Sequence, residues 1–219
     1  MKRLLFLAIF FLILVPIGYY FLSDQNKSKP LPVINPIDVQ QEMVDPEMLR
    51  MGKGHRIGAF RFQNQDGVWI TNAEMKGKVS VVEYFFTTCK GICPKLNTNM
   101  KQVYEIYKNE PDFQILSHTC NPDTDSVSVL KHYSDSLQVN TKKWIFLTGR
   151  KDSLYQMARG SYLLDDPKNN VEKIEDQFIH TQFFALVDRQ GKVRGKIYDG
   201  LKVLEVEQLK QDISKLLKE

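Results

Sequence analysis

A continuous run of apolar, β-prone residues ends directly before a pair of cysteines, and this junction restricts the fold more than any other feature of the chain. Residues 79–86 form the run, and the segment Thr87-Thr88-Cys89-Lys90-Gly91-Ile92-Cys93-Pro94 follows it. A strand without alternation is typical of a position buried on both faces of a sheet. Proline suits the first turn of a helix, where its missing N–H is not needed. The sequence therefore predicts a buried strand, then two thiols, then a helix from Pro94 to about residue 109.

Strand and helix patterns alternate through the remaining chain. Strands are predicted at residues 60–62, 68–70, 113–117, 144–147, 183–187 and 193–198. Helices are predicted at residues 126–137, 152–159 and 203–217, and residues 161–179 are expected to be irregular. Asp123, Thr124 or Asp125 is available as the N-cap of the first of these helices. Strands that alternate with helices imply parallel pairing through crossovers. We expect an α/β protein with a thioredoxin-like fold, in which flanking helices cover a mixed sheet that begins with an N-terminal β-hairpin.

The amino terminus has the pattern of a membrane segment. Residues 4–22 carry no charge, and a helix of that length spans roughly 29 Å, about one hydrocarbon core. Lys2 and Arg3 favour a cytoplasmic amino terminus, which places the rest of the chain on the outer, periplasmic side. We expect residues 1–23 to be a single-pass membrane anchor, with a cleaved signal peptide as the alternative. Residues 24–55, stiffened by prolines, read as a linker, and residues 56–219 as the thioredoxin-like domain.

Composition excludes several classes of protein. Apolar residues make up 42% of the 219 residues and charged residues 26%, which suits a folded domain rather than a disordered chain. The net charge is +4, and Lys2 and Arg3 supply half of it. A balance so close to neutral leaves no basic patch for a polyanion, so we expect no nucleic-acid partner.

The chemistry of the chain centres on Cys89 and Cys93. A helix N-terminus favours thiolate over thiol, as does a neighbouring lysine such as Lys90, and thiolate is the form that binds soft metals and attacks disulfides. Two thiolates and one imidazole make a low-coordinate set that favours Cu(I). The spacing alone does not decide which histidine completes such a set, and a stabilising disulfide remains the alternative. The histidines are His55, His118, His132 and His180.

The chain resembles the SCO/SenC family over about residues 56–219. The resemblance rests on Phe86-Thr87-Thr88-Cys89-x-x-x-Cys93-Pro94, on Asn121-Pro122-x-x-Asp125, on Leu147-Thr148-Gly149, and on His180 before a strand. It implies a membrane-anchored thioredoxin fold associated with copper delivery to cytochrome c oxidase, with Cys89, Cys93 and His180 as the copper ligands. Asn121 and Ile179 depart from the acidic residues that are usual at those two positions of the family.

Two functions follow from this resemblance and from the cysteine pair. The first is a metallochaperone that holds copper, as Cu(I) or Cu(II), and passes it to an oxidase subunit or another cuproprotein. The second is a thiol–disulfide oxidoreductase in which Cys89 attacks a partner disulfide and Cys93 resolves it. The first is not an enzymatic activity, whereas the second is. We expect Cys120 to be a small, half-buried side chain, His118 to be structural and His132 to be solvated.

Overall fold

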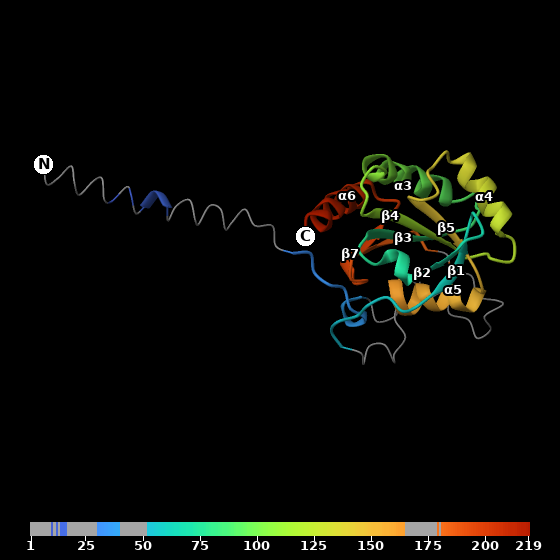
Figure 1. Cartoon of the computed structure of the whole chain (residues 1–219), viewed down its shortest axis with the longest axis horizontal. Helices are drawn as coiled ribbons and strands as arrows, with labels where there is room; N and C mark the ends of the chain where they lie inside the picture. The colour runs from blue at the N-terminus through green and yellow to red at the C-terminus, as the bar shows by residue number, and fades with distance from the viewer. Residues whose placement is uncertain are drawn as a thin grey trace, which may run out of the picture. The chain divides into compact units, whose positions relative to one another are not determined.

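The fold is built on a mixed sheet whose central strands are parallel (Figure 1). The computed structural model describes residues 30–39, 52–164, 179 and 181–219, together with residues 10, 12 and 14–16. Among these residues the strand order is β2-β1-β5-β4-β3-β6-β7. The strands are β1 (Arg61–Asn64), β2 (Trp69–Thr71), β3 (Val79–Phe85), β4 (Phe113–Thr119), β5 (Trp144–Thr148), β6 (Phe183–Val187) and β7 (Val193–Asp199).

Strand β3 pairs in parallel with β4, which pairs in parallel with β5, as the alternation of strands and helices predicts. The two hairpins flank this parallel part. β1 and β2 form the predicted N-terminal hairpin, which joins the sheet through antiparallel pairing of β1 with β5. β6 and β7 form the second hairpin, and β6 pairs antiparallel with β3. The mixed sheet and both hairpins of the predicted α/β architecture are therefore confirmed.

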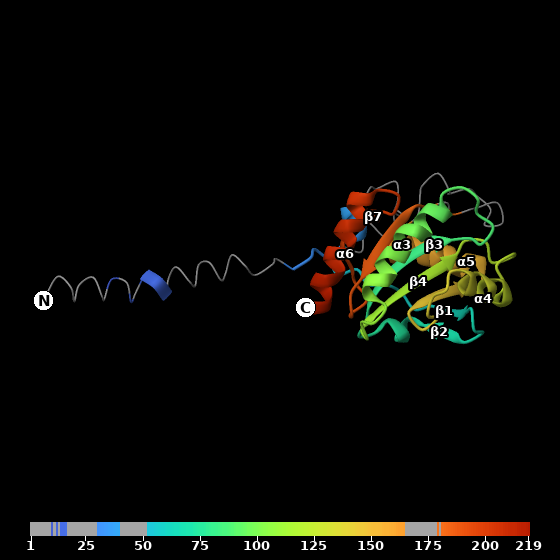
Figure 2. The same ribbon diagram turned by 90° about the horizontal axis from the view of Figure 1, so that it is seen from above.

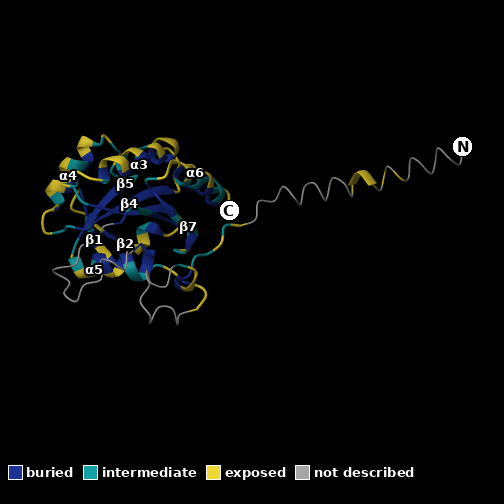
Figure 3. Cartoon of the chain, turned by 180° about the vertical axis from the view of Figure 1, so that it is seen from behind, coloured by how far each residue is buried: buried dark blue, intermediate teal, exposed yellow. Residues whose placement is uncertain are grey.

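Helices cover both faces of the sheet (Figure 1 and Figure 2). Their bounds are α3 (Cys93–Tyr107), α4 (Val127–Ser136), α5 (Lys151–Met157) and α6 (Val203–Lys218), with shorter turns η1 (Pro36–Asp38), η3 (Asn72–Met75) and η4 (Ala158–Tyr162). Apolar side chains of α3, α4 and α6 pack in one core layer against the sheet. Those of α5 and η4 pack in the other layer, together with the β1–β2 hairpin. Figure 3 shows the buried strands enclosed between helices whose outward faces are exposed.

Two local predictions need correction. The N-cap of α4 is Ser126, whose hydroxyl accepts a hydrogen bond from the Val129 N–H, and it is none of residues 123–125. Asp125 is turned inward to other partners, so it is not free to cap. The segment predicted to be irregular from residue 161 begins as the end of η4, with Tyr162, Leu163 and Leu164 fully buried. Burial of these apolar side chains therefore extends the ordered structure beyond residue 159, where the predicted helix ends.

The segment before the first hairpin contributes contacts to the domain. Residues Leu31–Glu219 form one compact unit, so part of the predicted linker packs with the sheet. Val33 bridges to Arg194 on β7, and the side chain of Asn35 accepts hydrogen bonds from the N–H groups of Gly54 and His55. The predicted membrane anchor lies almost entirely outside the described residues. Within the described part of the chain, no helix is long and apolar enough to cross a bilayer.

Candidate functional site

The two cysteines of the predicted site lie at the junction of β3 and α3. Cys93 is the first residue of α3 and is buried, whereas Cys89 lies four residues earlier in the connecting loop and is half-buried. Both are free thiols, as is Cys120. Burial tends to raise the pKa of Cys89, but hydrogen bonds from the Cys93 thiol and from the N–H groups of Cys93, Gly91 and Ile92 outweigh it. The net pKa of Cys89 is lowered, so Cys89 is the thiol favoured as thiolate.

Cys93 has the opposite tendency. Burial raises its pKa, and the hydrogen bond that its thiol gives to Cys89 and the charge of a Cys89 thiolate raise the pKa further. The pair therefore consists of a half-buried thiol with a lowered pKa, Cys89, and a buried thiol with a raised pKa, Cys93, which donates a hydrogen bond to it. Such a pair suits attack by Cys89 in thiol exchange, and it suits metal binding when the metal displaces the Cys93 proton.

A buried carboxylate ties the cysteine loop to the neighbouring strand. Asp125 Oδ2 accepts from the Thr87 N–H (3.1 Å) and from the Thr119 hydroxyl (2.5 Å), and Oδ1 accepts from the Thr87 hydroxyl (2.5 Å). Thr87 lies two residues before Cys89, and Thr119 is the last residue of β4. We call these three residues the Asp125 clasp. The clasp joins the loop after β3 to the loop after β4 at the same edge of the sheet.

Cys120 lies directly beyond β4 and is buried, more deeply than the half-buried position predicted for it. Its thiol donates to the Phe85 carbonyl oxygen at 3.1 Å. Burial raises its pKa well above the ordinary value for cysteine, and the charges of ionised Cys93 and Cys89 act in the same direction. Cys120 is therefore held as a neutral thiol close to the pair, without the thiolate character that reactivity requires.

His180, the third predicted ligand, lies outside the described residues, and its role stays a prediction. The residue before it is described. The Ile179 N–H donates to the Tyr155 hydroxyl (3.4 Å), which donates to the Cys120 carbonyl (2.8 Å). The chain next to His180 therefore meets the carboxyl end of β4, beside the strand that leads to Cys89. Ile179 is fully buried, which accounts for an apolar residue at this position.

The other three histidines differ from one another in their surroundings. His55 is buried with Nε2 at 2.8 Å from the Ser161 carbonyl oxygen. His118 is enclosed by aromatic rings, its ring stacked 5.2 Å from that of Tyr84, and His132 is exposed, as predicted. Among the described residues, no group of three or more histidine, cysteine or acidic side chains could hold a metal ion. A metal site built on Cys89 and Cys93 with a third histidine, cysteine or acidic ligand would therefore need a residue outside the described ones.

Sequence reasoning missed Glu83, which lies inside the run that was read as continuously apolar. Its side chain is buried, and burial raises the pKa of its carboxyl to about 7, although a hydrogen bond from Ser117 opposes the shift. Its charge also contributes to the raised pKa of Cys93. The signal was present, because a lone acidic residue in a strand buried on both faces needs a specific reason.

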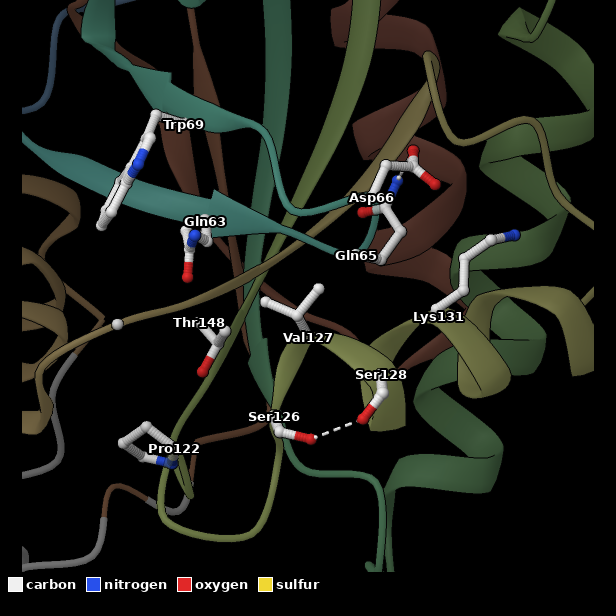
Figure 4. Close-up of a pocket in the computed structure, with 11 residues that line it drawn as sticks. Gln63, Gln65, Asp66, Trp69, Pro122, Ser126, Val127, Ser128, Lys131 and Thr148 are labelled. Atoms are coloured by element: carbon white, nitrogen blue, oxygen red, sulfur yellow. Dashed lines mark hydrogen bonds between the residues drawn. The ribbon is translucent and has the colours of Figure 1, made fainter.

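Two open grooves border the cysteine-bearing edge. One of about 760 Å³ is lined by Cys89 and Thr87 and continues between α3 and α4 past Pro94, Tyr133 and Leu137. The other, of about 910 Å³, is lined by residues of the β1–β2 hairpin, of the loop that follows β4, of α4 and of the end of β5 (Figure 4). Figure 4 shows side chains of the hairpin, of α4 and of the end of β5 around it, Trp69, Lys131 and Thr148 among them. Of the two grooves, only the first is lined by a cysteine, Cys89.

Comparison with known proteins decides the family. The family model described as SCO1/SenC matches residues 50–218, which is more than half of the chain. The chain belongs to the SCO1/SenC family. The resemblance drawn from the cysteine segment and the predicted thioredoxin-like fold are both confirmed.

Solved SCO structures show how far the likeness extends. A SCO1/SenC family lipoprotein from Bacillus anthracis is 31% identical with a TM-score of 0.62, and the match covers 74% of this chain and 95% of that one. BsSco, described as a cytochrome c oxidase assembly protein with a disulfide switch, is 30% identical with a TM-score of 0.61, covering 74% and 94%. ScoI of Bradyrhizobium japonicum was solved with copper bound. It is 20% identical with a TM-score of 0.59, covers 74% and 99%, and shows the shared fold.

Proposed function

We propose that this SCO1/SenC protein is a copper metallochaperone that serves the assembly of the copper centre of cytochrome c oxidase. The observation that carries the proposal is the thiol pair Cys89 and Cys93, free and hydrogen-bonded to each other at the carboxyl edge of the sheet. Family membership supports it, since one relative is described as an oxidase assembly protein and another holds copper. Two thiolates form a soft donor set that prefers Cu(I) to hard cations.

His180 completes the proposed ligand set. The described neighbours of His180 support this role, because Ile179 is linked through Tyr155 to Cys120 next to the cysteine pair. Copper is the cargo in this scheme. A three-coordinate ion leaves room for an incoming thiolate of the acceptor, so the ion can pass by stepwise ligand exchange without being released to water. Cys89, the more accessible of the two thiols, is the ligand that exchanges first.

We propose further that residues 1–23 tether the domain to the cell membrane on its outer side. The uncharged residues 4–22 behind Lys2 and Arg3 support this placement, as does the relative described as a lipoprotein. Fractionation of cells tests the tether, and labelling of Cys89 in intact cells with a membrane-impermeant maleimide tests the side. The mass of the purified chain separates an uncleaved anchor from a cleaved signal peptide.

Competition for Cu(I) tests the copper proposal. The full chain, reduced and kept free of oxygen in a mild detergent, is titrated against a chelator of known Cu(I) affinity. We expect one tight equivalent, weakened at least tenfold, or about 1.4 kcal/mol, by Cys89→Ala, Cys93→Ala and His180→Ala. Cys120→Ala and His132→Ala are the matched controls, since both residues lie outside the proposed ligand set. Copper binding that survives loss of both Cys89 and Cys93 would refute the proposal.

A thiol–disulfide oxidoreductase is the second candidate, favoured by the opposite pKa shifts of the pair. The Cys89 thiolate would attack a partner disulfide, forming a mixed disulfide and releasing the other partner sulfur as a thiolate that takes up a proton. The Cys93 thiol, on losing its proton, would then attack the Cys89 sulfur and release the partner's remaining thiolate. The product is a Cys89–Cys93 disulfide and a reduced partner. Cys93→Ala should then trap the mixed disulfide, whereas His180→Ala should leave this exchange intact.

A further inference from the structure

The Asp125 clasp joins two segments that are distant in sequence and adjacent in space. Thr87 belongs to the loop after β3, whereas Thr119 and Asp125 flank the loop after β4. The Asp125 side chain is fully buried and receives two hydroxyl donors at 2.5 Å and one backbone N–H at 3.1 Å. The Thr124 hydroxyl adds a long contact of 3.5 Å. The carboxylate is thus shared between both loops, and each of its oxygen atoms contacts Thr87.

A carboxylate in such a position needs strong compensation. Transfer of a charge out of water is unfavourable unless hydrogen bonds or an opposite charge replace the lost hydration. Among the ion pairs of the described residues, none involves Asp125. The compensation comes from neutral donors, and bonds to an ionised acceptor are about twice as strong as those between neutral groups. Three such bonds make the clasp a stiff link between the two loops.

The clasp acts on the half of the thiol pair that lies outside the helix. Cys93 is held within α3, whose first turn includes the Leu96 N–H bonded to the Ile92 carbonyl at 3.0 Å. Cys89 stands in a loop in which Thr88, Lys90 and Gly91 are exposed. The Cys89 N–H makes a 3.3 Å bond to the Phe86 carbonyl, so the turn that contains Thr87 carries Cys89 directly. The position of Cys89 relative to Cys93 therefore depends on where Asp125 holds Thr87.

We propose that Asp125 is a positioning residue for the thiol pair: through Thr87 it holds Cys89 at the distance from Cys93 at which the two sulfurs bind one copper ion or join in one disulfide. The part of this inference that concerns copper rests on the proposed function, and the part that concerns the disulfide does not. Supporting groups of this kind set geometry to within about half an ångström, and a loose support weakens a site whose ligands are all present.

Variants of Thr87 test the clasp with the carboxylate left in place. Thr87→Val keeps the side-chain shape and the N–H but removes the hydroxyl that contacts Asp125 Oδ1, and Thr87→Ser restores that hydroxyl. A matched control exists on the hairpin. The Thr71 N–H and hydroxyl both donate to Glu74, at 2.7 and 2.8 Å, in the same chemistry at a remote position. Thr71→Val therefore measures what loss of such a bond does to the fold alone.

The deciding measurement is the equilibrium between the thiol pair and glutathione, made on the full chain in detergent. One oxidised glutathione takes two electrons and two protons from the pair, which gives the Cys89–Cys93 disulfide and two reduced glutathione molecules. We expect Thr87→Val to lower this equilibrium constant at least fivefold, and Thr87→Ser and Thr71→Val to keep it within twofold of the wild-type constant. If the Asp125→Asn variant folds, it should lower the equilibrium constant more than Thr87→Val does. If it does not fold, the comparison of Thr87→Val with Thr87→Ser decides whether the clasp positions Cys89.

Cu(I) affinity is the second readout. Thr87→Val should weaken binding at least tenfold, with rescue by Thr87→Ser. Two results would overturn the positioning role. One is a glutathione equilibrium constant of Thr87→Val that stays within twofold of the wild-type constant. The other is a decrease in Thr71→Val as large as that in Thr87→Val. A wild-type chain that binds no Cu(I) overturns the proposed function instead and leaves the glutathione test of the clasp intact.

Discussion

Glu83 on β3 and Ser117 on β4 are register partners, and the Ser117 hydroxyl donates a 2.6 Å hydrogen bond to the Glu83 carboxyl group inside the sheet. Ser117 also accepts from the Trp144 indole N–H at 2.7 Å, so the three strands β3, β4 and β5 share one polar chain. The Glu83 side chain is buried, and burial raises its pKa to about 7 despite the bond from Ser117. A single bonded donor does not replace the water that an ionised carboxylate loses.

Glu83→Gln should change how stability depends on pH. Between about pH 4.5 and 7 the folded chain keeps a proton that the unfolded chain releases, so this group costs stability as pH rises through that window. Glutamine has no proton to release. The stability of the variant relative to wild type should therefore increase by up to about 3 kcal/mol between pH 4.5 and 8. Urea unfolding of both chains at pH 4.5 and pH 8 measures it, and a difference that stays constant with pH would contradict the prediction.

His118→Phe should show the opposite dependence on pH. His118 is fully buried among Tyr84, Phe62 and Tyr162, and neither ring nitrogen has a hydrogen-bond partner among the described residues. Burial lowers its pKa to about 3, so below the unfolded pKa near 6.5 the unfolded chain gains a proton that the folded chain cannot accept. Proton uptake by the unfolded chain favours unfolding, so His118 destabilises the wild-type protein increasingly as pH falls below about 6.5. Thermal unfolding at pH 7 and pH 4.5 should show the advantage of phenylalanine growing toward acid, and an advantage that shrinks would disprove it.

Gly195→Ala should destabilise the β6–β7 hairpin. Gly195 has φ +79°, which L residues rarely adopt, and a Cβ there would meet the Tyr198 hydroxyl oxygen. That hydroxyl donates to Asp212 on α6 at 2.9 Å. Strain and displacement of Tyr198 together should cost about 2 kcal/mol. The midpoint of urea unfolding measures this loss. Gly77→Ala is the control, because it shares a positive φ but has open space around its Cβ position, and an equal loss in both variants would leave strain alone as the cause.

Arg194→Met should loosen the attachment of the amino-terminal segment. The Arg194 guanidinium donates to Asp188 at 2.8 Å, to Glu219 at 2.9 Å and twice to the Leu31 carbonyl, and it is largely buried. Removing one partner of a buried ion pair leaves the other uncompensated, at a cost of about 3 kcal/mol. Loss of stability can be followed by urea unfolding and loss of attachment by amide exchange at Ile34. Asp188→Asn added to Arg194→Met should recover part of the stability, and no recovery would contradict the role of the pair.

Local pattern was sufficient to predict the elements that surround the site. The strand read at residues 113–117 is β4, the strand read at 144–147 is β5, and the cysteine helix extends to Tyr107 instead of residue 109. These predictions rest on short runs of β-prone residues and on proline at a helix start, which are properties of neighbouring residues. Pairing of β1 with β5 joins residues more than 80 positions apart, and no local pattern specifies it.

The candidate site likewise combines features that the local sequence predicts with features that only the folded sheet determines. The cysteine pair and the lowered pKa of Cys89 could be inferred from the helix N-terminus, whereas the raised pKa of Cys93 follows from its burial. Lys90, the other expected influence, is exposed. Asp125 was considered as a helix cap because acidic residues before helices often have that role. Its contact with Thr87 depends on β3 and β4 lying side by side, which only the folded sheet determines. His180 rests on family resemblance, because spacing along the chain did not distinguish it from the other histidines.

The contacts of residues 32–34 with β7 bear on how the domain can be handled as a fragment. β7 is the last strand in the sheet order, and the Gly195 N–H donates to the Pro32 carbonyl while the Ile34 N–H donates to the Val193 carbonyl, both at 2.8 Å. These bonds cover the outer edge of β7. A fragment cut to the family-matched region, from residue 50 onward, would leave that edge with unpaired donors and acceptors, the surface on which strands of separate molecules join. Aggregation of such a fragment would reflect the loss of the backbone that covers this edge and not a fault in the core, and starting the chain at residue 30 should prevent it.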